Sequence, residues 1–317
     1  MSVVVVGSMA YDAIETPFGK TDRILGGAAM YISLAASYFT RPVNAVSVVG
    51  YDFQAADLKM MGDHGVNLKG VQIKKDEKSF FWAGRYHNDM NTRDTLTTEL
   101  NVLGTFDPII PDEYQGCEFL MLGNLSPDVQ RTVIERLQKR PRLIVMDTMN
   151  FWMNIALDSL METLKMVDVL VINDEEARQL SGEYSLVKAA YKIMSFGPEY
   201  LVIKKGEHGA LLFHGHDLFS APGLPLEEVF DPTGAGDTFA GGFIGYMARS
   251  GRVNFENMKR AVIYGSAMAS FCVEKFGPER LQGLTQDAIQ NRVNKFVQLA
   301  NFEIIPRDLS DFLDQSA

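Results

Sequence analysis

The chain has 317 residues, of which 46% are hydrophobic and 22% are charged, a composition typical of one large or two modest globular domains. Its formal net charge is −10 and it has no dense run of Lys and Arg, which argues against nucleic acid as a partner and favours small ligands. The two cysteines, Cys117 and Cys272, each stand in a hydrophobic run, so we expect buried free thiols rather than a disulfide or a zinc site.

No stretch reaches the roughly 20 apolar residues that cross a bilayer. The apolar start of the chain lacks the basic segment of a signal peptide. We therefore expect a soluble, cytoplasmic protein without a membrane partner.

Short β-branched runs alternate with amphipathic stretches of helix length along most of the chain. The runs predict buried strands near residues 5, 46, 120, 145, 170 and 203. The amphipathic stretches predict helices at 27–39, 53–64, 127–139, 154–165, 174–181 and 185–196, followed by a mostly helical C-terminal third at 234–250, 254–275 and 285–299. This alternation is typical of an α/β fold with a doubly wound, mostly parallel sheet and helices on both faces, here as a single domain over residues 1–317.

Two segments, residues 10–25 and 70–103, interrupt this alternation. Both are polar, irregular or alternating, and SFFWAGRY at 79–86 indicates a strand with aromatic side chains on one side. Because both follow an early core element, we predict that they form a small β lid over the main domain; the alternative is a pair of ordinary surface hairpins. Exposed edges of lid strands often pair between subunits, so a homodimer through the lid is a further hypothesis.

The stretch DPTGAGDTFAGGF at 231–243 is a candidate anion site. A Gly-Ala-Gly turn that opens an apolar helix directs consecutive free N–H groups, at the positive end of the helix dipole, toward one point. Gly234, Ala235 and Gly236 would supply these groups, and the carboxylate of Asp237 could accept a proton from a hydroxyl. The alternative is an aspartate that caps a helix after a glycine-rich turn.

This stretch resembles the C-terminal signature of the ribokinase/PfkB family of carbohydrate and nucleoside kinases. Three other segments resemble elements of the same family, in the family's order: GGAAMYISLAA at 26–36, NDEEA at 173–177 and KKGEHGA at 204–210. The resemblance implies a ribokinase-like fold with a β lid and a kinase that depends on ATP and Mg²⁺.

The resemblance also implies roles for single residues on the phosphate side. Asp237 would be the general base, and the N–H groups of Gly234, Ala235 and Gly236 would hold the charge that develops on the transferred γ-phosphoryl group. Expected contacts to the cofactor come from Asn173, Lys204 and Gly206, from Gly265 beside adenine, from Glu176 to Mg²⁺ through water, and from Asp231 and Thr233 to a monovalent cation such as K⁺. Helix–helix packing explains Gly265 equally well, and an acid-rich helix start is the alternative for Asn173 and Glu176.

On the substrate side, Asp12 matches an aspartate with which the family binds substrate hydroxyls. The other expected substrate-binding residues are Gly26, Gly27, Tyr31 and Asp147. Two positions depart from the family pattern: Ala10 stands where members often carry Asn, and Tyr31 stands where the di-glycine element has a sugar-binding Asn. These changes remove hydrogen-bonding capacity and add a ring on which a substrate can stack.

The predicted activity is transfer of the γ-phosphoryl group of ATP to a hydroxyl of a small sugar. The first alternative is a nucleoside kinase of the adenosine or inosine type on the same scaffold. It is motivated by Ala10, by Tyr31 and by the lid aromatics Phe18, Phe80, Phe81, Trp82 and Tyr86. The second alternative is a non-catalytic nucleotide-binding protein, against which the intact Asp237 and Gly-Ala-Gly turn argue.

Overall fold

The computed structural model describes residues 1–301 and contains a large and a small β-sheet. The remaining residues of the expected domain, 302–317, lie outside the described part. The large sheet has nine strands in the order β13-β12-β11-β10-β9-β8-β1-β4-β5. Its strands are β1 (Val3–Val6), β4 (Val43–Val49), β5 (Val66–Ile73), β8 (Phe119–Leu122), β9 (Leu143–Asp147), β10 (Val169–Asn173), β11 (Tyr200–Lys204), β12 (Ala210–His214) and β13 (Asp217–Ala221).

Every neighbouring pair from β11 to β5 is parallel, as the sequence predicted. Strands β12 and β13 continue the sheet as an antiparallel hairpin beside β11, which the sequence analysis did not predict. Strands β1, β4, β8 and β9 are buried along their whole length, because helices cover both faces of the sheet.

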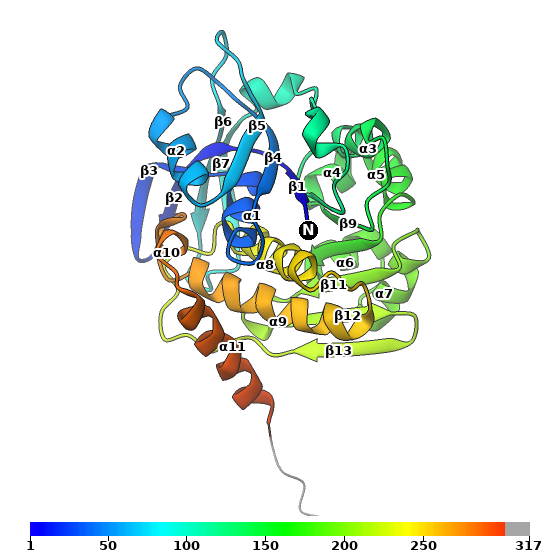
Figure 1. The fold of residues 1–317 in the computed structure, drawn as a ribbon. Coiled ribbons are helices and arrows are strands. Elements are labelled where there is room, and N and C mark those ends of the chain that lie inside the picture. Colours follow the sequence, from blue (N-terminus) through cyan, green and yellow to red (C-terminus); the bar gives the residue numbers. More distant parts are fainter. Residues whose placement is uncertain (302–317) are drawn as a thin grey trace, which may run out of the picture.

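The two faces of β1 show how the helical layers divide the core. Val3 and Val5 belong to the hydrophobic cluster that contains side chains of α1, α8 and α9, whereas Val4 and Val6 belong to the cluster that contains side chains of α3 and α5 to α7. Figure 1 shows α8 and α9 side by side, with α1 next to them. The helices are α1 (Ala28–Ala36), α2 (Ala55–Asp63), α3 (Pro127–Arg136), α4 (Asn150–Ile155), α5 (Leu157–Leu164), α6 (Asp174–Ser181), α7 (Leu186–Met194), α8 (Ala235–Ser250), α9 (Phe255–Cys272), α10 (Glu279–Gln282) and α11 (Gln286–Ala300), with 3-10 turns η1 (Asn101–Thr105), η2 (Asp112–Tyr114) and η3 (Gly206–His208).

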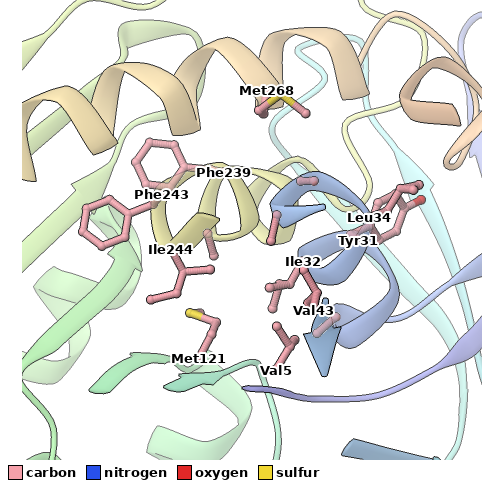
Figure 2. Close-up of a cluster of buried hydrophobic side chains, with 14 of the residues drawn as sticks. Val5, Tyr31, Ile32, Leu34, Val43, Met121, Phe239, Phe243, Ile244 and Met268 are labelled. Carbon is pink, nitrogen blue, oxygen red and sulfur yellow. The ribbon is translucent and has the colours of Figure 1, made fainter. Parts of the chain in front are cut away.

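The contact between α8 and α9 is close enough to need small residues. Figure 2 shows Phe239 and Phe243 of α8 in this core, with Met268 of α9 above them. A Cβ atom on Gly265 would lie 2.7 Å from the backbone oxygen of Phe239. Helix packing therefore accounts for Gly265 in this structure, and its expected contact with adenine stays a prediction.

The small sheet is built from the two segments that interrupt the strand–helix alternation. Its order is β3-β2-β6-β7, with β2 and β6 parallel and the outer pairs antiparallel. The strands are β2 (Ala10–Thr16), β3 (Gly19–Gly26), β6 (Phe80–Tyr86) and β7 (Arg93–Glu99). The first part of the expected segment 70–103 belongs elsewhere, because residues 70–73 pair with β4 and complete β5 at the edge of the large sheet. Strand β7 is an exposed edge strand, and pairing of two subunits through it stays a prediction.

Within residues 1–301, no helix has both the length and the apolar character needed to cross a bilayer.

Candidate active site

The polar residues that the sequence singled out lie at the carboxyl ends of adjacent parallel strands, the edge at which open α/β sheets bind ligands. Asp147, Asn173 and Lys204 are the last residues of β9, β10 and β11. Lys204 reaches past β10, and its Nζ donates a hydrogen bond to Oδ2 of Asp147 at 3.2 Å. Both side chains are largely buried, so this is an interior ion pair rather than a solvated one.

The Gly-Ala-Gly turn forms the beginning of α8 as predicted. Gly234 caps the helix in the left-handed conformation, with φ of +74°, and an added Cβ would lie 2.4 Å from the ring of Tyr31. Glycine is therefore required here for its backbone conformation and for space. A Cβ on Gly236 would lie 3.0 Å from Nζ of Lys204, so the lysine ammonium group stands directly beside the turn.

The three expected N–H donors of this turn are not equivalent. The N–H of Ala235 already donates to the carbonyl oxygen of Pro232 at 3.2 Å, which closes the turn before the helix. In the described part of the chain, the N–H groups of Gly234 and Gly236 donate to no protein acceptor. The expectation of a free amide is therefore wrong for Ala235, because its N–H already donates to Pro232, three positions earlier. It can serve a ligand only through a shared bond.

Asp237 stands in the first turn of α8, and its carboxylate is in the field of several charges. Burial and the negative charge of Asp147 raise the pKa of Asp237 to about 7, while the positive charges of Lys204 and Arg93 oppose the rise. A general base is most effective when its pKa lies near the working pH. Conversely, burial lowers the pKa of Lys204, but the carboxylates of Asp147, Glu176 and Asp237 raise it above its ordinary value.

Asn173 and Glu176 form a capping box at the start of α6. The side chain of Asn173 accepts from the N–H of Glu176 at 2.8 Å, and Oε2 of Glu176 accepts from the N–H of Asn173 at 2.7 Å. Burial raises the pKa of Glu176 to about 7, and the positive charge of Lys204 opposes this. One carboxylate oxygen is thus committed to the cap, and within residues 1–301 the other has no protein donor.

Asp12 lies on the opposite side of the site, on β2 of the small sheet. Asp12 is only 5% exposed, and a Cβ on Gly26 would lie 2.0 Å from its Oδ2, so the di-glycine element leaves room for this side chain. Tyr31 is buried nearby, and among the described residues its hydroxyl has no hydrogen-bond partner. These two groups give this side of the site one carboxyl group and one hydroxyl that a ligand can satisfy.

We expect the substitution Asp12→Asn to stabilise the protein at alkaline pH. Burial and the charges of Asp231 and Asp237 raise the pKa of Asp12 to about 8, against about 4 in an unfolded chain. The stability that Asp12 contributes in its protonated form is present below about pH 4 and is lost as the pH rises through about 8. The melting temperature of the variant should exceed that of the wild type by about a few degrees near pH 8 and match it near pH 4.

Thermal unfolding at the two pH values measures this gap. Asp22→Asn, on the exposed part of β3, is the matched control and should leave the melting temperature unchanged at both. A gap of the same size at both pH values would contradict the prediction.

Asp231 is fully buried and holds two distant backbone segments together. Its Oδ1 accepts from the N–H of Thr233 at 2.8 Å, and its Oδ2 accepts from the N–H of Gly277 at 2.9 Å. Both oxygens therefore have structural partners. Within the described ranges, no cluster of three or more His, Cys, Asp or Glu side chains is arranged to hold a metal ion. Binding of K⁺ at Asp231 and Thr233 stays a prediction.

The contacts of the small sheet with this site were not predicted from the sequence. Trp82 lies opposite Asp12 in the ladder of β2 and β6, so both side chains project from the same face. On that face the hydroxyl of Thr233 donates to the hydroxyl of Tyr86 at 3.1 Å. Phe81 lies opposite Tyr11 on the other face of the small sheet. The alternation of side chains along SFFWAGRY could have indicated this. Phe18 lies against Phe230 instead, with ring centroids 5.4 Å apart.

A buried carboxylate beside the glycine-rich start of α8, at the carboxyl ends of a parallel sheet, is an arrangement that suits phosphoryl transfer to a hydroxyl. The profile of the pfkB family of carbohydrate kinases matches residues 1–282. The chain therefore belongs to the pfkB family, whose members here include carbohydrate and nucleoside kinases.

Individual relatives agree with this assignment. The chain is 29% identical to a cytidine kinase of Thermococcus kodakarensis over 78% of this chain and 89% of the relative. It is 22% identical to a nucleoside kinase of Methanothermobacter thermautotrophicus, over 87% and 91% of the two chains. Its fold is similar to that of a protein assigned as ribokinase II from E. coli, solved with ATP and Mg²⁺, with a TM-score of 0.75, 19% identity and coverage of 94% and 99%.

Proposed function

We propose that this protein transfers the γ-phosphoryl group of ATP to a hydroxyl of a nucleoside. The observation that carries the nucleoside is the pairing of Asp12 with Trp82 on one face of the small sheet. A ribose whose hydroxyls bind the Asp12 carboxylate would have an indole face within reach of its base. The names of two relatives, a cytidine kinase and a nucleoside kinase, support the same substrate class.

The proposed chemistry follows from the residues at the start of α8. The carboxylate of Asp237 accepts the proton of the acceptor hydroxyl. That oxygen then forms a bond to the γ-phosphorus, the bond from this phosphorus to the β–γ bridging oxygen breaks, and ADP leaves with the electron pair. The N–H groups of Gly234 and Gly236 and the ammonium group of Lys204 stabilise the charge on the transferred group.

The residues present also fit a magnesium ion held through water. The carboxylate oxygen of Glu176 that the capping box leaves free can accept from a metal-bound water, which suits an ion that keeps most of its hydration shell. When bound, Mg²⁺ neutralises charge on the β- and γ-phosphates.

A substrate panel tests the proposal. With ATP and Mg²⁺, we expect kcat/KM for cytidine, adenosine or inosine to exceed that for free ribose by about 10-fold or more. Trp82→Leu should raise KM for the nucleoside by roughly 5- to 150-fold, since stacking of a base on an aromatic ring is worth about 1–3 kcal/mol. Phe81→Leu, on the other face of the same strand, is the control.

A second candidate is a kinase for a small sugar, which the family assignment itself favours. Turnover of free sugars with none of any nucleoside would establish it and overturn our proposal. ADP formation that no acceptor stimulates would instead support a nucleotide-binding protein without this activity.

A further inference from the structure

The hairpin between β6 and β7 crosses the phosphate side of the site. At the end of β6, where the turn of the hairpin begins, Tyr86 accepts a hydrogen bond from Thr233, the residue directly before Gly234. At its tip, Oδ1 of Asn91 lies where it would be 2.8 Å from a Cβ on Gly206, in the turn after β11. The hairpin therefore contacts both the turn before α8 and the turn at Gly206, from which contacts to the cofactor are expected.

Arg93 is the first residue of β7 and lies opposite Tyr86 in the β6–β7 ladder. Directly paired residues project from the same face of a sheet, so Arg93 shares the face of Tyr86, Trp82 and Asp12. Its guanidinium carbon lies 6.0 Å from the centre of the Trp82 ring. In the described part of the chain this guanidinium has no carboxylate partner and donates no hydrogen bond.

Arg85, on the neighbouring strand, shows the opposite arrangement. Its Nε donates to Oε1 of Glu15 at 2.8 Å, on the face of the small sheet that turns away from Asp12. The hairpin thus carries two arginines with different surroundings. Arg85 is paired with Glu15 outside the site, whereas Arg93 faces the site and, among the described residues, has no carboxylate partner.

The charge of Arg93 acts on both acidic groups of the phosphate side. It opposes the rise that burial causes in the pKa of Asp237 on α8 and in the pKa of Glu176 on α6. Lys204, the other cation at this edge, already has Asp147 as its counterion. A triphosphate bound here would therefore meet Lys204, which is paired with Asp147, and Arg93, which has no carboxylate partner in the described part of the chain.

We propose that Arg93 is a further catalytic residue, which donates hydrogen bonds to the oxygens of the γ-phosphoryl group during its transfer. The inference rests on the proposed function and adds the small sheet as a second element that contacts the transferred group. The N–H groups at the start of α8 bind the γ-phosphoryl group on one side, and the guanidinium of Arg93 binds it on the side of the small sheet. A planar guanidinium can donate to two phosphate oxygens at once. Donors aimed at charge that develops in the transition state contribute mainly to kcat.

The test compares Arg93→Met, Arg93→Lys and the control Arg85→Met in the full chain, with the best nucleoside acceptor, ATP and Mg²⁺. We expect kcat to fall by about 10²-fold or more in Arg93→Met, to recover partly in Arg93→Lys, and to stay within about twofold in Arg85→Met. The acid limb of the pH profile should move to higher pH in Arg93→Met, since a positive charge that favours the ionised form of Asp237 is lost. Melting temperatures should not change, because Arg93 is exposed.

A kcat for Arg93→Met as high as that of Arg85→Met, with an unchanged acid limb, would overturn the inference. If the wild type turns over no acceptor, the proposed function fails separately, and calorimetric affinities for ATP and ADP then decide about Arg93. Contact with the γ-phosphate requires that the preference for ATP over ADP drop in Arg93→Met and not in Arg85→Met. An unchanged preference for ATP over ADP in Arg93→Met would show that Arg93 does not contact the γ-phosphate.

Discussion

Replacing Asp237 with Asn should lower kcat by about 10²- to 10⁴-fold while leaving KM for ATP nearly unchanged. Asparagine has the shape of aspartate but cannot accept the proton of the acceptor hydroxyl. In the wild type, kcat/KM should rise as the pH passes through about 7, because Asp237 becomes ionised there, and the residual rate of the variant should lack this rise. Steady-state rates on both sides of this pH measure both effects.

The control for this substitution is Glu175→Gln, which removes an exposed carboxylate from the first turn of α6. It should leave kcat unchanged. An Asp237→Asn variant that keeps more than about a tenth of the wild-type kcat would show that another group takes the proton, and the assignment of the base would be wrong.

Gly234→Ala should abolish most activity without unfolding the protein. A non-glycine residue in the left-handed region costs about 1–2 kcal/mol, and here the new methyl group also overlaps the ring of Tyr31. Either the ring or the turn must move, and a displacement of about 1 Å in a positioned group can cost about 10²-fold in rate. Activity and melting temperature of the variant separate the two contributions.

Gly251→Ala provides the matched control at the other end of the same helix. Gly251 is also left-handed, with φ of +64°, but its added Cβ meets only the flexible side chain of Met1. It should lose a similar amount of stability and keep its activity. Equal activity losses in both variants would mean that helix stability, rather than the shape of the Gly-Ala-Gly turn, controls the rate.

Local pattern was sufficient to predict most of the large sheet. A strand that is covered on both faces is apolar throughout, so runs such as VVVV at 3–6 could be read without knowledge of their neighbours. The β12–β13 hairpin was missed, since β13 has exposed polar positions and belongs to the sheet only through pairing with β12. Residues 70–73 were misplaced for a similar reason, because β5 is a half-covered edge strand whose alternation resembles that of the small sheet.

For the site, the sequence predicted which residues belong together but not what each one touches. Asn173 and Glu176 could have been recognised as a capping box, because that motif depends only on a spacing of three residues. The hydrogen bonds of Lys204 with Asp147 and of Thr233 with Tyr86 join residues far apart in the chain. Their contacts depend on strand order and on how the small sheet lies, which no local pattern encodes.

The hydrogen bonds of Asp231 give the molecule a mechanical link between remote parts of its sequence. The carboxylate of Asp231 accepts hydrogen bonds from Thr233, in the turn before α8, and from Gly277. Gly277 in turn lies close to Ile24 of β3, because an added Cβ would be 2.5 Å from that side chain. Inherited or engineered changes near residue 277 should therefore alter turnover although they touch neither reactant.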